Sequence, residues 1–126
     1  MTKTILVIDD EPDIREVVCL VLEELGGWQA DQAGSGQEGL AKAGAQPWDA
    51  ILLDVSMPDM DGVAVFKELQ ARPSTQAVPV ILLTARVLKS DIDRFTELGV
   101  AGIIAKPFNP LQVWRDLATM LGWPVD

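Results

Sequence analysis

The stretch "AILLDVSMPDMDG", residues 50–62, decides the fold class and contains the first candidate site residue. Its opening run, residues 50–53, is short and continuously apolar, which is typical of a strand buried on both faces of a parallel sheet. Asp54 follows at once, so its carboxylate lies either at the strand's C-terminal tip or in the loop behind it. A carboxylate in that position is costly unless it has a polar partner or binds a ligand.

Four more apolar runs flank this one, and helical periodicity fills the gaps between the runs. The predicted strands are Thr4–Ile8, Gln29–Ala33, Ala50–Leu53, Val80–Leu83 and Gly102–Ala105. Apolar residues that step by three and four predict helices over 14–25, 37–43, 63–69, 92–98 and 110–121. Asp61, Ser90 and Asn109 are the expected N-caps, with Pro110 at the first helical position of the last helix. This alternation predicts an α/β fold: a doubly wound five-stranded parallel sheet with helices on both faces.

Length and composition indicate one acidic domain. The chain has 126 residues and a formal net charge of −9, which argues against direct binding to nucleic acid or to an anionic membrane. Its apolar runs are too short to span a bilayer, and we expect no membrane association. A single cysteine, Cys19, excludes an internal disulfide and fits a reducing compartment, so we expect a cytoplasmic location.

The chain contains no histidine. This excludes Ser-His and Cys-His nucleophilic pairs, histidine-ligated metals and a role as a phosphohistidine carrier. Carboxylates, hydroxyls, one thiol and lysines remain available for chemistry.

The candidate site residues follow the predicted strands. In doubly wound sheets, ligands bind outside the carboxyl ends of the strands. Those ends carry Asp9-Asp10-Glu11, Asp54, Thr84 and Lys106. Taken singly, each has an ordinary structural role: acidic residues favour a helix N-terminus, a threonine caps a turn, and a lysine is a solvated charge. Asp59 and Asp61 are better explained as turn and cap residues than as ligands.

Together these residues predict more than structural roles. Asp9, Asp10 and Asp54 would repel one another at close range unless a cation lies among them, and carboxylates with water suit Mg²⁺. The metal and Lys106 would bind a phosphoryl group, and Thr84 would donate to one of its oxygens. Phosphoryl transfer depends mainly on positioning and charge neutralisation. Asp54 would then be the nucleophile and form an aspartyl phosphate.

Four motifs, "ILVIDDE", "ILLDVSMPDMDG", "VILLTA" and "GIIAKPF", occur in this order along the chain, each at a strand tip. With them the chain resembles the receiver domain of two-component response regulators over essentially its whole length, as a single domain from 1 to 126. The resemblance implies the flavodoxin-like receiver fold with strand order 2-1-3-4-5. It also implies a phosphorelay signalling protein that catalyses only its own phosphorylation and slow dephosphorylation.

By this resemblance Asp54 is the phospho-acceptor and Asp10 a direct Mg²⁺ ligand. Asp9 holds a metal-bound water, and Ser56 offers its backbone carbonyl to the metal. Thr84 and Lys106 contact the phosphoryl group, helped by backbone N–H groups of Ser56 and Ala85. The Lys106–Pro107 peptide is expected to be cis. One position departs from the family pattern: Ile103 stands three residues before the lysine, where relatives commonly carry Tyr or Phe.

Three rival functions are weaker. A haloacid-dehalogenase-like phosphatase or phosphotransferase needs a second acid two residues after its nucleophile, where this chain has Ser56. An EF-hand reading aligns Asp59, Asp61, Gly62 and Glu68 with calcium positions, but the first ligand position is Met57. A flavodoxin-like nucleotide binder would need a phosphate loop after the first strand, and none follows.

The resemblance also implies partners. The phosphoryl donor would be a histidine kinase or a histidine phosphotransfer protein, and the output an unidentified downstream protein. These residues contain no DNA-binding or catalytic output domain. The start at Met1 and the ending "LGWPVD" favour a stand-alone regulator, a monomer or phosphorylation-dependent homodimer. The alternative is a receiver fragment of a larger regulator.

Overall fold

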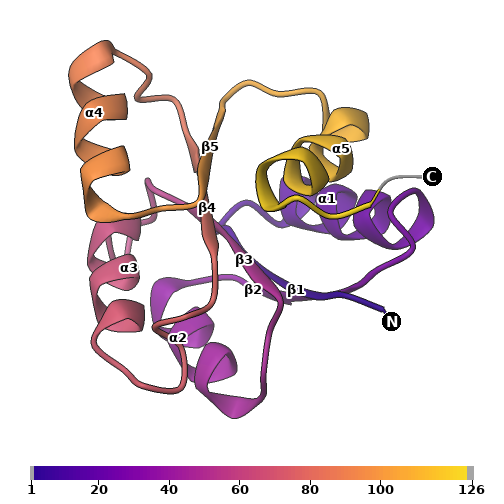
Figure 1. The fold of residues 1–126 in the computed structure, drawn as a ribbon, viewed down its shortest axis with the longest axis horizontal. Helices are drawn as coiled ribbons and strands as arrows, with labels where there is room; N and C mark the ends of the chain where they lie inside the picture. Colours follow the sequence, from indigo (N-terminus) through magenta and orange to yellow (C-terminus); the bar gives the residue numbers. More distant parts are fainter. Residues whose placement is uncertain (1, 125–126) are drawn as a thin grey trace.

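The computed structural model describes residues 2–124 and confirms the predicted α/β architecture (Figure 1). The strands are β1 (Thr4–Ile8), β2 (Gln29–Ala33), β3 (Ala50–Asp54), β4 (Val80–Thr84) and β5 (Gly102–Ala105). The helices are α1 (Pro12–Glu24), α2 (Gly36–Ala45), α3 (Gly62–Gln70), α4 (Lys89–Leu98) and α5 (Pro110–Leu121). All neighbouring strands pair in parallel, in the expected order β2-β1-β3-β4-β5.

Helices cover both faces of the sheet, with α1 and α5 on one side and α2, α3 and α4 on the other (Figure 1). Successive residues of a strand point to opposite faces, and β3 shows the consequence clearly. Ile51 and Leu53 pack in the cluster that contains Phe66 of α3, whereas Leu52 packs in the cluster of α1 and α5. Both faces are therefore apolar, which explains the continuous hydrophobic run in the sequence. Within residues 2–124, each helix is too short or too polar to cross a bilayer.

Two strands extend one residue beyond their predicted ends. The prediction ended β3 at Leu53 and β4 at Leu83, whereas the sheet includes Asp54 and Thr84. Asp54 is in register with Leu83 of β4, because backbone pairing does not require an apolar side chain. Only 2% of each polar residue is exposed. The sheet itself therefore fixes the backbone of both residues.

The helix starts were predicted with mixed success. Asp61 caps α3 and Asn109 caps α5, each accepting a backbone N–H two residues ahead. The prediction of Ser90 as a cap was wrong: α4 begins at Lys89, after Leu88, which forms no side-chain cap bond. Lys89 pairs with Asp93 one turn later at 2.9 Å, an ion pair that the capping pattern did not anticipate.

Helix α2 is longer than predicted. Ser35 accepts the Glu38 backbone N–H at 3.1 Å, and the helix runs on through Gly44. Because glycine often ends helices, Gly44 is the expected stop after residue 43, but this glycine lies within the helix.

Three tryptophans pack together on the face of the sheet that α1 and α5 cover. Trp28 meets Trp123 edge to face with ring centroids 5.1 Å apart, and meets Trp114 at 6.4 Å. Such aromatic pairs contribute about 1 kcal/mol each beyond the area they bury. Trp28 directly precedes β2, Trp114 lies within α5 and Trp123 follows α5. The cluster therefore lies near the start of β2, away from the C-terminal strand tips.

Candidate functional site

The C-terminal ends of β1 and β3 bring three aspartates together. One carboxylate oxygen from each of Asp9, Asp10 and Asp54 lies within 4.8 Å of the others. Asp9 is completely buried, Asp54 is 2% exposed, and Asp10 is half-buried. In the part of the chain that the structure describes, this is the one such group of potential metal ligands. The fold therefore assembles the predicted carboxylate cluster.

Lys106, at the end of β5, lies against this cluster. Its ammonium nitrogen is 3.2 Å from Asp54 Oδ1 and 3.4 Å from Asp9 Oδ2. It is also 3.7 Å from Glu11 Oε1, a strand-end residue to which the sequence assigns no role in the site. The Lys106 side chain is 17% exposed, so the cation is largely withdrawn from water. The Lys106–Pro107 peptide is cis, as expected from the resemblance.

Burial and charge together shift the acid–base properties of the site. Burial, reinforced by the Asp9 charge, raises the pKa of Asp54 from 3.8 to about 6, although Lys106 and the Ser56 N–H oppose the rise. For Lys106, burial alone would lower the pKa, but the charges of Asp9 and Asp54 outweigh it and raise the pKa. Among the three aspartates and Lys106, two negative charges remain uncompensated when all are ionised.

Backbone groups orient the site's side chains. The Glu11 N–H donates to Asp9 Oδ1 at 2.9 Å, and the Ser56 N–H is directed at Asp54 Oδ1 at 3.4 Å. Thr84 is buried at the tip of β4, and its hydroxyl oxygen accepts the Arg86 N–H at 2.9 Å. Ser56 and Ala85 are exposed residues of the loops that follow β3 and β4. The Ser56 N–H faces Asp54, and Ala85 lines the same groove as Lys106.

Asp59 and Asp61 have structural roles, as predicted. Asp59 accepts the N–H groups of Gly36 and Gln37 at 3.0 and 3.1 Å, and these bonds lower its pKa. Asp61 is occupied in capping α3. With both carboxylates committed to helix N-termini, the EF-hand interpretation has no support.

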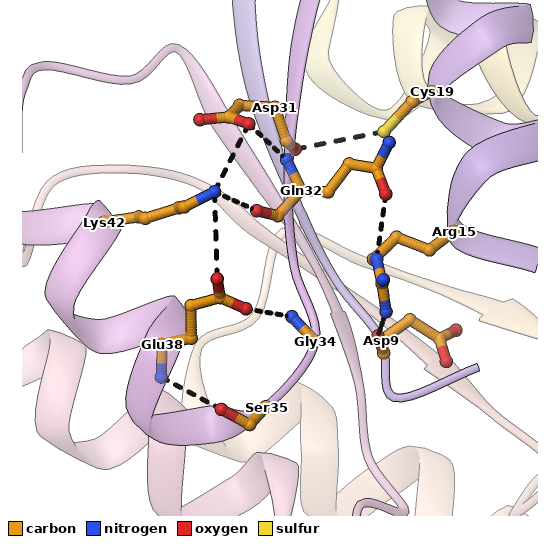
Figure 2. Close-up of polar contacts among 9 residues, drawn as sticks. All are labelled: Asp9, Arg15, Cys19, Asp31, Gln32, Gly34, Ser35, Glu38 and Lys42. Atoms are coloured by element: carbon orange, nitrogen blue, oxygen red, sulfur yellow. Dashed lines mark hydrogen bonds and ion pairs between the residues drawn. The ribbon is translucent and has the colours of Figure 1, made fainter. Parts of the chain in front are cut away.

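Arg15 is a residue that the sequence analysis missed. Figure 2 shows its guanidinium between α1 and β2. Its Nε donates to Gln32 Oε1 at 2.9 Å, and its Nη1 donates to the backbone carbonyl of Asp9 at 2.8 Å. No local sequence pattern indicates these contacts, because they join α1 to β2 and to Asp9 at the end of β1.

The donor set of the cluster fits a hard divalent cation. Mg²⁺ prefers carboxylate oxygens and water as ligands. The cluster offers three carboxylates, and half-buried Asp10 leaves it open to water. Its excess negative charge also favours a cation. The geometry thus combines an anionic cluster, a buried lysine and a buried hydroxyl at one edge of a parallel sheet.

Comparison with known proteins identifies this arrangement. The model of the response regulator receiver domain matches residues 5–117. The chain belongs to this family. Receiver domains are signalling modules of two-component systems rather than ordinary enzymes, and this one shares their fold and strand order.

Individual relatives agree with this assignment. The receiver domain is 39% identical to the phosphate regulon transcriptional regulatory protein PhoB of Escherichia coli K12 over 114 residues, which cover 90% of this chain and 49% of PhoB. It thus spans about half the length of that relative. It is 32% identical over 105 residues to a probable chemotaxis protein CheY of Rhizobium etli, covering 83% of this chain and 81% of that protein.

A solved structure adds information on the metal. The receiver domain of the sensor histidine kinase PA1611 from Pseudomonas aeruginosa PAO1 has 30% identity and a TM-score of 0.83. The match covers 97% of this chain and 99% of that one. Its structure holds a magnesium ion coordinated in the active site cleft.

Ile103 is the departure from the family pattern. It is half-buried and packs against the hydrophobic core on the face of the sheet that α2, α3 and α4 cover. It also lines a groove with Val87 and Ile92. An isoleucine side chain is stiff at χ1 and has no hydroxyl, so it cannot exchange one hydrogen bond for another.

Proposed function

We propose that this receiver domain accepts a phosphoryl group on Asp54 in a Mg²⁺-dependent reaction and thereby changes the surface it presents to a downstream protein. The observation that supports this most directly is the geometry of Asp54. Its buried carboxylate shares a site with Asp9 and Asp10 and lies 3.2 Å from the Lys106 ammonium. An acceptor held beside a fixed cation needs little further rearrangement.

Each residue has a separate role in this proposal. An Asp54 carboxylate oxygen attacks the phosphorus of the donor, and the leaving group departs on the opposite side. Lys106 Nζ neutralises charge on the transferred oxygens. The Thr84 hydroxyl and the N–H groups of Ser56 and Ala85 donate to those oxygens. Because Asp54 Oδ1 already faces Lys106, the phosphoryl group would arrive next to its counter-charge.

Asp9, Asp10, Asp54 and the Ser56 carbonyl would hold Mg²⁺. When bound, the metal supplies charge neutralisation for the acceptor carboxylate and the phosphoryl oxygens. The carboxylate cluster and its uncompensated charge support this assignment. The chemistry of the chain would be limited to its own phosphorylation and slow dephosphorylation.

The donor must be another molecule, because the chain has no histidine. We propose a phosphohistidine of a histidine kinase or phosphotransfer protein. An apolar groove of about 500 Å³ borders the site and includes Ile14, Val17, Lys106 and Phe108. Val17 is 43% exposed although apolar, as expected of a surface that a partner covers. A protein docked there would bring its histidine close to Lys106 and Asp54.

We also propose that residues 1–126 form one receiver domain that acts through protein contacts, as a monomer or a phosphorylation-dependent homodimer. The match to a CheY protein over 81% of that protein's length supports this organisation. The PhoB match favours the alternative, a receiver within a longer regulator. A phosphatase of the haloacid dehalogenase type is not supported, because Ser56 occupies the position that its general acid requires.

Incubation with a small acyl phosphate and Mg²⁺, followed by intact mass measurement, tests the proposal. We expect one added phosphoryl group, and none in Asp54→Asn or after chelation of Mg²⁺. Asp61→Asn is the matched control: the same change in the following loop, at a position where asparagine caps a helix as well as aspartate does. Equal labelling of Asp54→Asn, or labelling that ignores chelation, would refute the assignment. Turnover of an ordinary phosphoester would instead favour the phosphatase.

A further inference from the structure

We propose that Arg15 is a positioning residue for the Mg²⁺ site, acting through the backbone of Asp9 rather than through its own charge. This inference rests on the proposed function, because it concerns how the carboxylate cluster is held in place to bind the metal. This role needs only the contact of Arg15 with the Asp9 carbonyl, and no contact with a carboxylate of the cluster.

The contacts of Asp9 show why it depends on Arg15. Its N–H donates to the carbonyl of Ala33 in β2 at 3.1 Å, and its own carbonyl accepts from Arg15 Nη1 at 2.8 Å. Its carboxylate accepts the Glu11 N–H. Both backbone groups of Asp9 are therefore hydrogen-bonded, its N–H to Ala33 and its carbonyl to Arg15. Its carboxylate, completely buried, has little room to compensate for a moved backbone.

The arginine is itself fixed at both ends of its guanidinium. Nε donates to the side-chain oxygen of Gln32, at the adjacent position of β2, while Nη1 reaches Asp9 (Figure 2). A Cβ atom added at Gly34 would lie 3.1 Å from Nη1, so the glycine leaves the room that the guanidinium occupies. A lysine at position 15 would present one compact ammonium instead of the planar fork whose two nitrogens reach these two acceptors.

The charge of Arg15 and its positioning role predict opposite effects on Mg²⁺ binding. If Arg15 mattered only as a nearby cation, its removal would tighten binding, as it would for Lys106. If it holds the Asp9 carbonyl, its removal lets the β1–α1 turn move and weakens binding. Residues that orient metal ligands typically change metal affinity by about tenfold or more when replaced.

Mg²⁺ titration of four proteins, followed through amide NMR shifts at Asp10 and Glu11, provides the test. We expect Arg15→Met to weaken Mg²⁺ binding about tenfold and Lys106→Met to tighten it. Lys42→Met is the control from the same network: Lys42 bonds to the Gln32 carbonyl and to Asp31, but not to Asp9, and its Mg²⁺ affinity should equal that of wild type.

Two further readouts separate positioning from a general loss of structure. The Glu11 amide signal of the metal-free protein should move in Arg15→Met and stay in place in Lys42→Met, since that N–H bonds to Asp9 Oδ1. The phosphorylation rate of Arg15→Met should fall at low Mg²⁺ and recover at saturating Mg²⁺, because Asp54 and Lys106 are unchanged.

The outcomes distinguish this inference from the proposed function. If wild type binds no Mg²⁺, both fall. If wild type binds Mg²⁺ and Arg15→Met binds it equally or more tightly, the positioning role alone is wrong. Should Arg15→Met fail to fold, Gln32→Leu keeps the arginine but removes the Nε acceptor, and it should weaken Mg²⁺ binding in the same direction. Unchanged affinity in Gln32→Leu would then overturn the role.

Discussion

Replacing Asp54 with asparagine should make the metal-free domain more stable at neutral pH, although it removes the proposed phospho-acceptor. The folded protein holds an ionised carboxylate that is 2% exposed and close to Asp9. Asparagine has nearly the same shape and keeps an oxygen that can accept the Ser56 N–H. It removes the charge, however, and with it the cost of burying that charge.

The pKa of Asp54 sets the size and sign of this effect. Burial first and the Asp9 charge second raise it from 3.8 to about 6 in the folded state. Each unit corresponds to about 1.4 kcal/mol, so the ionised carboxylate destabilises the fold by about 3 kcal/mol at neutral pH. Because the folded pKa is the higher one, the stability from protonated Asp54 is present at low pH and lost as pH rises through 6. This pKa already includes the attraction between Lys106 and Asp54. Because the asparagine adds a buried amide N–H donor in place of a carboxylate oxygen, we expect a net gain of about 2 kcal/mol.

Urea unfolding in a chelator, from about pH 5 to pH 7.5, measures this difference. The advantage of Asp54→Asn should shrink by about 1.4 kcal/mol between pH 7.5 and pH 5, because wild type then takes up a proton on Asp54. Carboxylates remote from Asp54 are the same in both proteins, so their contributions cancel in the difference. Excess Mg²⁺ should close the gap by stabilising wild type. A variant no more stable than wild type at pH 7.5, or a difference that ignores pH, would refute the reasoning.

Three further predictions concern Lys106, two glycines and the loop after β4. Lys106→Met should slow phosphorylation yet tighten Mg²⁺ binding, because it removes a cation 3.2 Å from Asp54 Oδ1; weaker binding in a titration would contradict this. Gly62→Ala should cost about 2 kcal/mol in urea unfolding, since its Cβ would lie 2.5 Å from the Asp54 carbonyl oxygen. Gly44→Ala, with nothing within 4 Å, should instead stabilise by up to about 1 kcal/mol, and equal effects would refute the contrast. Phosphorylation or a beryllofluoride mimic should shift the amide NMR signals of residues 85–89 more than that of Ile103. A larger shift at Ile103 would show that this isoleucine responds to phosphorylation in place of the Tyr or Phe of relatives.

The fold could be predicted from sequence because its signals are local and repeated. A run such as Ala50–Leu53 is apolar at every position, since both faces of β3 are covered, and this pattern recurs in β1 and β4. Strand β2, with the sequence QADQA, has only a weak signal, and its place at the sheet edge explains why it can be so polar. The strand order itself came from the resemblance and not from the pattern.

The carboxylate cluster could also be predicted, because parallel strands end at the same edge of a sheet. Once Asp9 and Asp54 are placed at strand tips, the topology brings them together whatever the details of the loops. The strand ends were harder to predict. The drop in hydrophobicity after Leu53 predicts the end of β3 there, whereas the backbone ladder continues to Asp54.

Contacts between distant side chains could not be predicted. The tryptophans at 28, 114 and 123 meet at one end of the molecule, but each alone looks like an ordinary amphipathic residue in its own segment. Ser90 shows a related limit: serine is a frequent cap, yet whether it caps depends on where the preceding loop delivers the chain.

Lys106 and Arg15 show why residue type alone cannot assign a role at this site. Both are cations near Asp9, but Lys106 Nζ faces its carboxylate at 3.4 Å, whereas Arg15 Nη1 faces its carbonyl at 2.8 Å. The first contact would compete with a bound metal for the same carboxylate oxygens. The second leaves those oxygens free and fixes the backbone that carries them. We therefore expect a positive charge to oppose metal binding at Lys106 and to support it at Arg15, according to the atom that each side chain contacts.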